Sequence, residues 1–135
     1  MKLEFPVSAS GRTLYLMISG TTFAMQSHVV NLRVTLTYAN GAEEPHNLVN
    51  PFTIGDCWNQ YRYHDTPANG FENLGGRSGP AGSAGIADLS RPIAVDTEAH
   101  LVAFDLRRDA ALRSVRLEAV ANDVIFGVMG ATVCK

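Results

Sequence analysis

The sequence predicts an all-β protein with antiparallel strands arranged as a β-sandwich. Three observations support this fold class. Apolar and polar residues alternate strictly over residues 30–38, which is the period of a strand with one buried face. Short apolar segments are separated by turn-forming residues at intervals of roughly ten residues. No segment has the period of an amphipathic helix, and residues 109–113 would supply at most one helical turn.

Length and composition agree with one globular domain. The 135 residues are 46% hydrophobic and 18% charged, which provides enough apolar material for a core and argues against general disorder. The formal net charge is −2 at pH 7. Because a binder of nucleic acid or of an anionic membrane needs a basic surface, we expect neither partner.

The N-terminal part predicts two strands. Leu3, Phe5 and Val7 alternate with polar residues or proline, and Gly11 separates this segment from the next. Residues 13–18 are apolar on both faces, which favours a central strand that is covered on both sides.

Residues 30–38 predict the first strand of a hairpin. The dipeptide Asn40-Gly41 follows, and it favours a two-residue type I′ turn in which both residues have positive φ. The returning strand covers about residues 43–49. It is polar and contains Pro45, which indicates an edge strand or an irregular strand.

The C-terminal third predicts three more strands, at residues 101–106, 114–120 and 124–133. Gly127 and Gly130 lie inside the last of them, where glycine indicates a bulge or a close approach of another backbone.

The inward positions of these strands give a predicted core. Its members are Leu14, Leu16, Ile18, Leu32, Val34, Leu36, Val102, Phe104, Val115, Leu117, Phe126 and Val128.

A long Gly-rich loop is predicted at residues 55–91. A loop of this length inside a small domain is usually functional or flexible. Its first half is aromatic, and we expect it to be ordered. Residues 75–85 are small and cannot bury enough apolar surface to offset the entropy of ordering, so we expect them to be mobile, with fast hydrogen exchange.

The segment 56–65 offers the side chains of a sugar-binding site. Sugar C–H faces stack on aromatic rings, and carboxylate, amide and guanidinium groups bind hydroxyls. The candidate carbohydrate-binding residues are Asp56, Trp58, Asn59, Tyr61, Arg62, Tyr63, His64 and Asp65. The same aromatic residues also suit a simple anchor for the loop. For Trp58 we favour a plug at the open end of the sandwich, with Tyr61, Tyr63 and His64 as the exposed contacts.

No catalytic residue is assigned, and the domain is not expected to be an enzyme. Asp56 and Asp65 are close in sequence, but nothing predicts the raised pKa that a glycosidase acid needs. Cys57 and His64 lie seven residues apart in a Gly-rich loop, which is not a recognised arrangement of nucleophile and base.

No cofactor is expected, because the four histidines lack metal-ligand spacing. A structural calcium ion stays open, since oxygen ligands occur near predicted strand ends, at Asp105, Asp109, Asn122 and Asp123. Cys57 and Cys134 are expected to be buried or half-buried thiols, and a disulfide between them stays open as well.

The order of three motifs resembles a known module. These motifs are Thr-Leu-Tyr-Leu-Met-Ile at 13–18, Leu-Arg-Val-Thr-Leu-Thr-Tyr-Ala-Asn-Gly at 32–41, and Phe-Thr-Ile-Gly-Asp-Cys-Trp at 52–58. The chain resembles the galactose-binding-like jelly-roll domains appended to large bacterial glycoside hydrolases, over most of its length outside residues 62–92. Two positions depart from the usual pattern, namely Asn40, which replaces an aspartate, and Cys57.

The resemblance implies a jelly-roll sandwich of about eight strands over residues 1–135. It also implies a non-catalytic accessory module of a glycoside hydrolase, with carbohydrate or the adjacent catalytic domain of the same polypeptide as its partner. The alternative is a ligand-free structural or protein-interaction domain that packs on a neighbouring domain or on a second copy, so a homodimer stays open.

The N-terminus has an acidic residue and a proline where a signal peptide has its apolar run. No segment reaches the ~18 apolar residues of a membrane span. We therefore expect a soluble chain without a signal peptide, and its localisation is not assigned.

Overall fold

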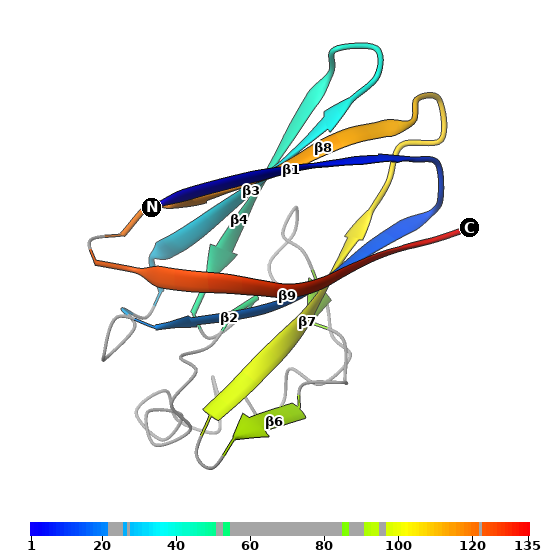
Figure 1. Cartoon of the computed structure of the whole chain (residues 1–135). Helices are drawn as coiled ribbons and strands as arrows, with labels where there is room; N and C mark the ends of the chain where they lie inside the picture. The colour runs from blue at the N-terminus through cyan, green and yellow to red at the C-terminus, as the bar shows by residue number, and fades with distance from the viewer. Residues whose placement is uncertain are drawn as a thin grey trace.

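The computed structural model describes residues 1–21, 26, 28–50, 53–54, 85–86, 91–94, 97–121 and 123–135. Within these residues the chain is all-β, and two antiparallel sheets pack face to face as a sandwich (Figure 1). The predicted fold class is confirmed at this level. No helix occurs in the described part of the chain.

The described residues form nine strands. They are β1 (Lys2–Ala9), β2 (Thr13–Thr21), β3 (Val30–Tyr38), β4 (Glu43–Val49), β5 (Gly85–Ile86), β6 (Arg91–Ala94), β7 (Thr97–Asp105), β8 (Leu112–Ala119) and β9 (Ile125–Cys134). Sheet A has the order β1-β8-β3-β4. Sheet B has the order β5-β7-β2-β9, with β6 also paired to β7.

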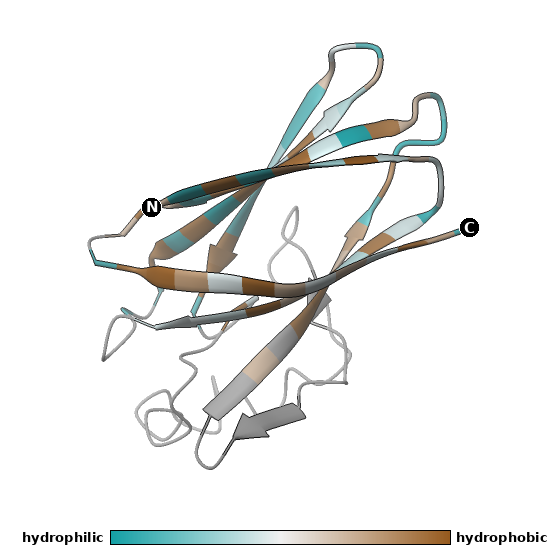
Figure 2. Ribbon diagram, viewed as in Figure 1, coloured by the Kyte–Doolittle hydropathy of each residue, from teal (hydrophilic) through white to brown (hydrophobic). Residues whose placement is uncertain are grey.

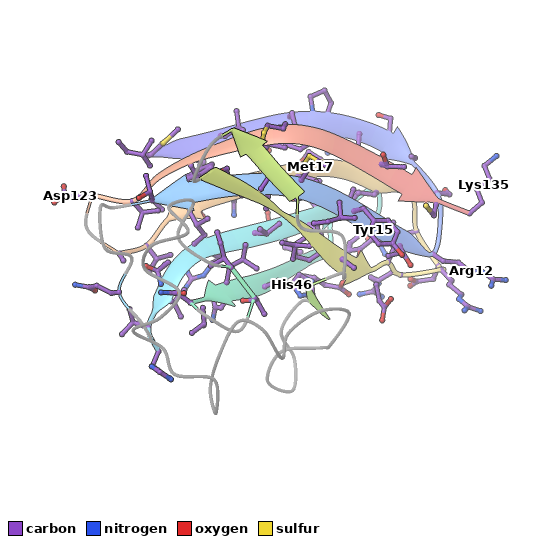
Figure 3. All side chains as sticks on the ribbon, turned by 90° about the horizontal axis from the view of Figure 1, so that it is seen from below. Arg12, Tyr15, Met17, His46, Asp123 and Lys135 are labelled. Carbon is purple, nitrogen blue, oxygen red and sulfur yellow. The ribbon has the colours of Figure 1, made fainter. Side chains whose placement is uncertain are left out.

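The two sheets are stacked so that their edges coincide on one side. Figures 1 and 3 show β1 of sheet A and β9 of sheet B running along the same side of the sandwich. The opposite edges are β4 in sheet A and β5 in sheet B. The sandwich therefore has a β1/β9 side and a β4/β5 side, each with two edge strands.

The core lies between the sheets, as the period-two pattern predicts. Eleven of the twelve predicted core residues are buried, and Val128 is partly buried against them. Seven further hydrophobic residues are buried, namely Tyr38, Leu48, Ile54, Ala99, Leu106, Leu112 and Val124. Figure 2 shows hydrophobic and hydrophilic residues alternating along β1 and β8, whereas β9 has no hydrophilic stretch.

The hairpin of β3 and β4 has the predicted bounds, and β4 is an edge strand as Pro45 indicates. The predicted turn type is wrong. Gly41 has φ 86°, but Asn40 has no positive φ, and the Gly41 N–H donates to the Tyr38 carbonyl at 2.9 Å. This is a type I turn closed by a glycine bulge, in which only Gly41 needs the left-handed region. The Asn40 side chain accepts a hydrogen bond from the Ala42 N–H at 3.0 Å, which fixes the turn locally.

The predicted loop at 55–91 is too long. Residues 85–86 form β5 and pair with β7, so that Ile86 lies opposite Val102, and β6 begins at Arg91. These strands are two and four residues long, and among the described residues they pair with β7. They bring the strand number to nine rather than about eight. The rest of the predicted mobile segment, residues 75–84, lies outside the described residues.

The other strand ends shift by a few residues. The strand predicted at 101–106 is Thr97–Asp105, and that predicted at 114–120 is Leu112–Ala119. Gly130 takes part in the predicted bulge of β9, because Met17 lies opposite Gly130 while Ile18 lies opposite Val128. Met129 is therefore the extra residue of the bulge.

Candidate functional site

All eight candidate carbohydrate-binding residues lie outside the described residues. They are Asp56, Trp58, Asn59, Tyr61, Arg62, Tyr63, His64 and Asp65. The predicted roles of these residues, the plug at Trp58 included, stay predictions. Cys57 also lies outside the described residues.

The chain on either side of this segment is fixed on one side of the sandwich. It leaves the edge strand β4 after Val49 and returns at β5 with Gly85, the edge strand of the other sheet. Its entry is held by Thr53, whose N–H donates to the Val49 carbonyl at 2.9 Å and whose hydroxyl accepts from the Val49 N–H at 2.7 Å. Ile54 follows and is fully buried. The segment with the candidate residues thus begins from a rigid anchor on the β4/β5 side.

Hydrogen bonds of His28 and Asn31, around the start of β3, support this anchor. The His28 N–H donates to the Asn50 carbonyl at 2.7 Å, and His28 has φ 62°. The buried Asn31 amide donates to the carbonyls of Gln26 at 2.8 Å and Val29 at 3.0 Å. These bonds tie the start of β3 to the end of β4. Their role is to satisfy backbone groups where the strands end.

A cluster of charged and aromatic groups closes the hairpin end of sheet A. The Tyr38 hydroxyl is buried, donates to Glu44 Oε2 at 2.9 Å, and accepts from the Arg107 N–H at 3.3 Å. The Arg107 guanidinium lies 5.8 Å from the Tyr38 ring centroid and 3.7 Å from Glu44 Oε1. Burial, together with the Glu44 carboxylate, raises the pKa of Tyr38 and keeps the phenol protonated.

The Arg107 side chain continues into a bidentate pair with Asp109. Its Nε lies 3.0 Å from Asp109 Oδ1 and its Nη2 lies 2.9 Å from Oδ2. The hydrogen bonds and charge of Arg107 lower the pKa of Asp109. Since Tyr38, Glu44, Arg107 and Asp109 are engaged with one another, the cluster works as a clamp between the hairpin and the segment after β7.

His46 is a polar group that enters the space between the sheets. It occupies an inward position of β4 opposite Val34, and its ring packs edge-on against Phe104 of sheet B with centroids 5.3 Å apart (Figure 3). Its Nε2 atom is buried, and no described residue pairs with it. Burial lowers the pKa of His46, and the nearby Glu44 opposes this shift in part. A neutral imidazole therefore lies at the β4/β5 side, below the anchor of the candidate segment.

The outer side of sheet B has a different character, and we call it the apolar face. It includes the partly exposed Tyr15, Met17 and Leu101, Ile125 at the edge, and Gly127 and Gly130 between them, together with the uncharged polar residues Ser19, Thr21 and Thr132. Figure 3 views the molecule from this side and shows where Tyr15 and Met17 lie. Ile125 is 65% exposed, and Met129 in the adjacent bulge is 46% exposed.

The two glycines of the apolar face are not required by the fold around them. Neither has a positive φ, and a Cβ added at Gly127 or Gly130 would meet no atom within 4 Å. Glycine inside a strand costs ~0.5–1 kcal/mol relative to alanine. At these two positions no side chain projects from the sheet. Gly130 lies opposite Met17 of β2, and Gly127 lies opposite Ser19.

The described residues contain no group of three His, Cys, Asp or Glu side chains placed to hold a metal ion. Of the calcium candidates, Asp109 pairs with Arg107, Asp105 ends β7, Asp123 has φ 62°, and Asn122 lies outside the described residues. Cys134 is free and exposed, so the expectation of a buried thiol is wrong for this residue. It lies at the end of the edge strand β9.

No helix in the described part of the chain is long and apolar enough to cross a membrane. In comparisons with known proteins, no family model, no curated protein and no solved structure matches the chain.

Sequence reasoning missed the Tyr38 clamp and the apolar face. Tyr38 and Arg107 are 69 residues apart, and no local pattern joins them. The apolar face did have a signal, since the strands with Tyr15, Met17 and Ile125 have few charged residues at outward positions. That signal becomes readable only once the register assigns those positions to one side of a sheet.

Proposed function

We propose that this chain is a non-catalytic module that acts by docking the apolar face of sheet B onto another protein surface. This is the structural or protein-interaction role. An accessory domain that braces a neighbouring catalytic domain, as the resemblance to glycoside hydrolase modules implies, performs the same role.

One observation carries the proposal: the outer side of sheet B combines apolar side chains with glycines that the chain itself does not need. Gly127 and Gly130 border Met17 and Ser19, and an added Cβ would meet nothing there. A flat surface without projecting side chains permits close approach of a second surface. Exposed apolar side chains on a surface without charges, such as Ile125 and Met129 here, are typical of interaction sites.

A footprinting experiment tests this without knowledge of the partner. We expect Met17 and Met129 to be oxidised more slowly by hydroxyl radicals in cells that produce the protein than in the dilute purified protein. Met1, which is 64% exposed and outside this face, serves as the internal control and should react equally in both. Equal rates at all three methionines in the two settings would contradict the docking role.

A matched variant sharpens the test. Gly130→Ala should leave the isolated chain at least as stable, because the new methyl group meets open space. The same change should raise the oxidation rate of Met17 in cells, since the methyl group holds a docked surface away. If Met17 remains protected from oxidation in cells when Gly130 is replaced by alanine, the partner does not dock beside Gly130.

Carbohydrate binding is the second candidate. It is supported by the rigid anchor at Val49 and Thr53, from which the segment 56–65 begins. A glycan array with the whole chain tests it, with the double variant Tyr61→Ala/Tyr63→Ala as the disruption and Tyr15→Ala on the apolar face as the control. Binding that only the double variant abolishes would favour the sugar-binding role, and no binding to any glycan would contradict it.

Jelly-roll topology is part of the same proposal, and the strand order supports it. β1 and β2 lie in different sheets, and each pairs with a late strand, β8 and β7 respectively. A two-stranded ribbon that rolls over both sheets in this way is the basis of a jelly roll. Two strands differ from the simple scheme, because β4 returns beside β3 and β9 adds an edge beside β2.

A further inference from the structure

We propose that the free edge of β9 is a self-association site, at which β9 of one copy pairs antiparallel with β9 of a second copy. β9 ends sheet B, and within the described residues β2 is the strand that pairs with it. The opposite backbone edge of β9 thus presents N–H and C=O groups for another strand. This site is the free backbone edge of sheet B. Ile125 lies both at this edge and on the apolar face, but strand pairing through the backbone does not depend on the proposed docking of that face.

β9 has the composition of an unprotected edge. Its ten residues, Ile-Phe-Gly-Val-Met-Gly-Ala-Thr-Val-Cys, contain no charged residue and no proline. It is also the longest strand among the described residues. Natural proteins normally protect edge strands with lysine, other charges, proline or strong bulges, because an open edge pairs readily with another chain.

The edges of sheet A show that protection. β1 has Lys2, Glu4 and Pro6, and its pairing with β8 is interrupted after Pro6, where Ser8 has φ 52°. β4 begins with two glutamates followed by Pro45. These devices discourage pairing at β1 and β4, and β9 has none of them except the bulge at Met129.

A second copy of this chain is the partner that the charge pattern fits. Antiparallel pairing about a two-fold axis places each strand against itself, so a charged edge would bring like charges together. β9 avoids this repulsion entirely, since it has no charge. A charged peptide strand would find no complementary charge on β9, whereas an uncharged apolar strand of equal length would match it.

Pairing would also cover exposed apolar side chains. Ile125 is 65% exposed and Met129 is 46% exposed, and both belong to β9. The dimer would extend sheet B of one copy into sheet B of the next. Because β9 lies on the β1/β9 side, the β4/β5 side would stay accessible in both copies.

Sedimentation velocity of the whole chain over a range of concentrations tests the inference. We expect a monomer–dimer equilibrium that Ile125→Lys and Met129→Lys each weaken by about tenfold or more, because each puts two like charges at the new seam. Val120→Lys is the matched control, since Val120 is also 46% exposed but lies outside β9, and it should leave the equilibrium unchanged.

Hydrogen exchange of the unmodified protein gives a second readout that needs no variant. Backbone amides of β9 should exchange more slowly at high than at low protein concentration, while those of β1 and β4 should not change. A monomer at all concentrations, or a dimer whose β9 amides show no added protection, would overturn the inference. A dimer that Met17→Lys weakens as strongly as the β9 variants do, and whose β9 amides gain no protection, would instead indicate association through the apolar face, so the exchange of the β9 amides separates the two proposals.

Discussion

The outer sides of the two sheets are built from the same period-two strands, yet they differ in charge. On sheet A, oppositely charged and polar residues form rows across the strands, such as Lys2, Glu118, Arg33 and Asn47. Arg33 Nε donates to Asn47 Oδ1 at 3.1 Å, and Lys2 lies 3.8 Å from Glu118. The outer side of sheet B is instead the apolar face. The charged rows of sheet A suit a surface that faces water, whereas the outer side of sheet B has no such rows.

Glycine separates the two sides as well. The glycines of the apolar face occupy open space, whereas Gly11, between β1 and β2, lies against the last residues of β9. There the Arg12 N–H donates to the Cys134 carbonyl at 2.7 Å and holds the two segments close together. The chain thus has two kinds of glycine next to β9, one that packing requires and one with open space around it.

The largest expected effect follows from this contrast. Gly11→Ala should destabilise the fold by ~1–3 kcal/mol, because its Cβ would overlap the Cys134 carbonyl oxygen and the Val133 side chain. Thermal melting measures the change, with Gly130→Ala as the control that should melt at the same temperature or higher. Equal losses for both variants would show that the two glycines are not different in kind.

The clamp of sheet A predicts the next largest effect. Tyr38→Phe removes a buried hydroxyl that binds Glu44 and the Arg107 N–H, so stability should fall by ~1 kcal/mol. Tyr15→Phe, on the apolar face, should change stability little, because the Tyr15 hydroxyl lies on the outer side of its sheet. Denaturant unfolding of both variants checks the pair, and an equal loss at Tyr15 would contradict the contrast between the sheets.

The charged rows of sheet A predict a smaller effect. Arg116→Ala removes contacts of 3.8 Å to Glu43 and 3.5 Å to Glu118 at a partly exposed position, and should cost less than about 1 kcal/mol. It should also reduce the salt dependence of unfolding, since exposed pairs are screened by ions. If Tyr15→Ala on the apolar face reduced the salt dependence of unfolding as much as Arg116→Ala does, charge would not distinguish the outer side of sheet A from that of sheet B.

The smallest expected effect is a pH dependence that arises from His46. Burial lowers its pKa below the value of 6.5 that the unfolded chain keeps, so the unfolded state binds more protons below that pH. The free energy of unfolding contributed by His46 is fully present above pH ~6.5 and is lost as pH falls through the lowered pKa. Unfolding measured between pH 7 and pH 5 should show this loss, and His46→Phe should remove it. An unchanged slope in the variant would assign the pH dependence to other groups.

Local patterns were enough to predict much of this fold, because the hairpin of β3 and β4 combines strict alternation with an Asn-Gly turn. They were not enough for β5 and β6, whose two and four residues become strands only through pairing with β7. The turn type predicted at Asn40 is wrong because the Asn-Gly dipeptide also fits a type I turn in which the glycine forms a bulge.

Sites depended on distant contacts even more than strands did. Arg107 reaches Tyr38 across 69 residues, and the apolar face exists only because the register brings Gly130 beside Met17. The composition of β9 is visible in the sequence, but its position at an edge follows from the order of strands in sheet B. The sugar-binding prediction for residues 56–65 still rests on composition and resemblance, because these residues lie outside the described part of the chain.

The placement of the two termini has a mechanical consequence. The chain starts at β1 in sheet A and ends with β9 in sheet B, and Figure 1 shows N and C at opposite ends of the sandwich. A tension between the termini pulls β1 along β8 and β9 along β2. The ladder hydrogen bonds lie perpendicular to these strands, so they are loaded together in shear instead of opening one by one. Tension transmitted through this domain is therefore resisted by two whole strand ladders at once.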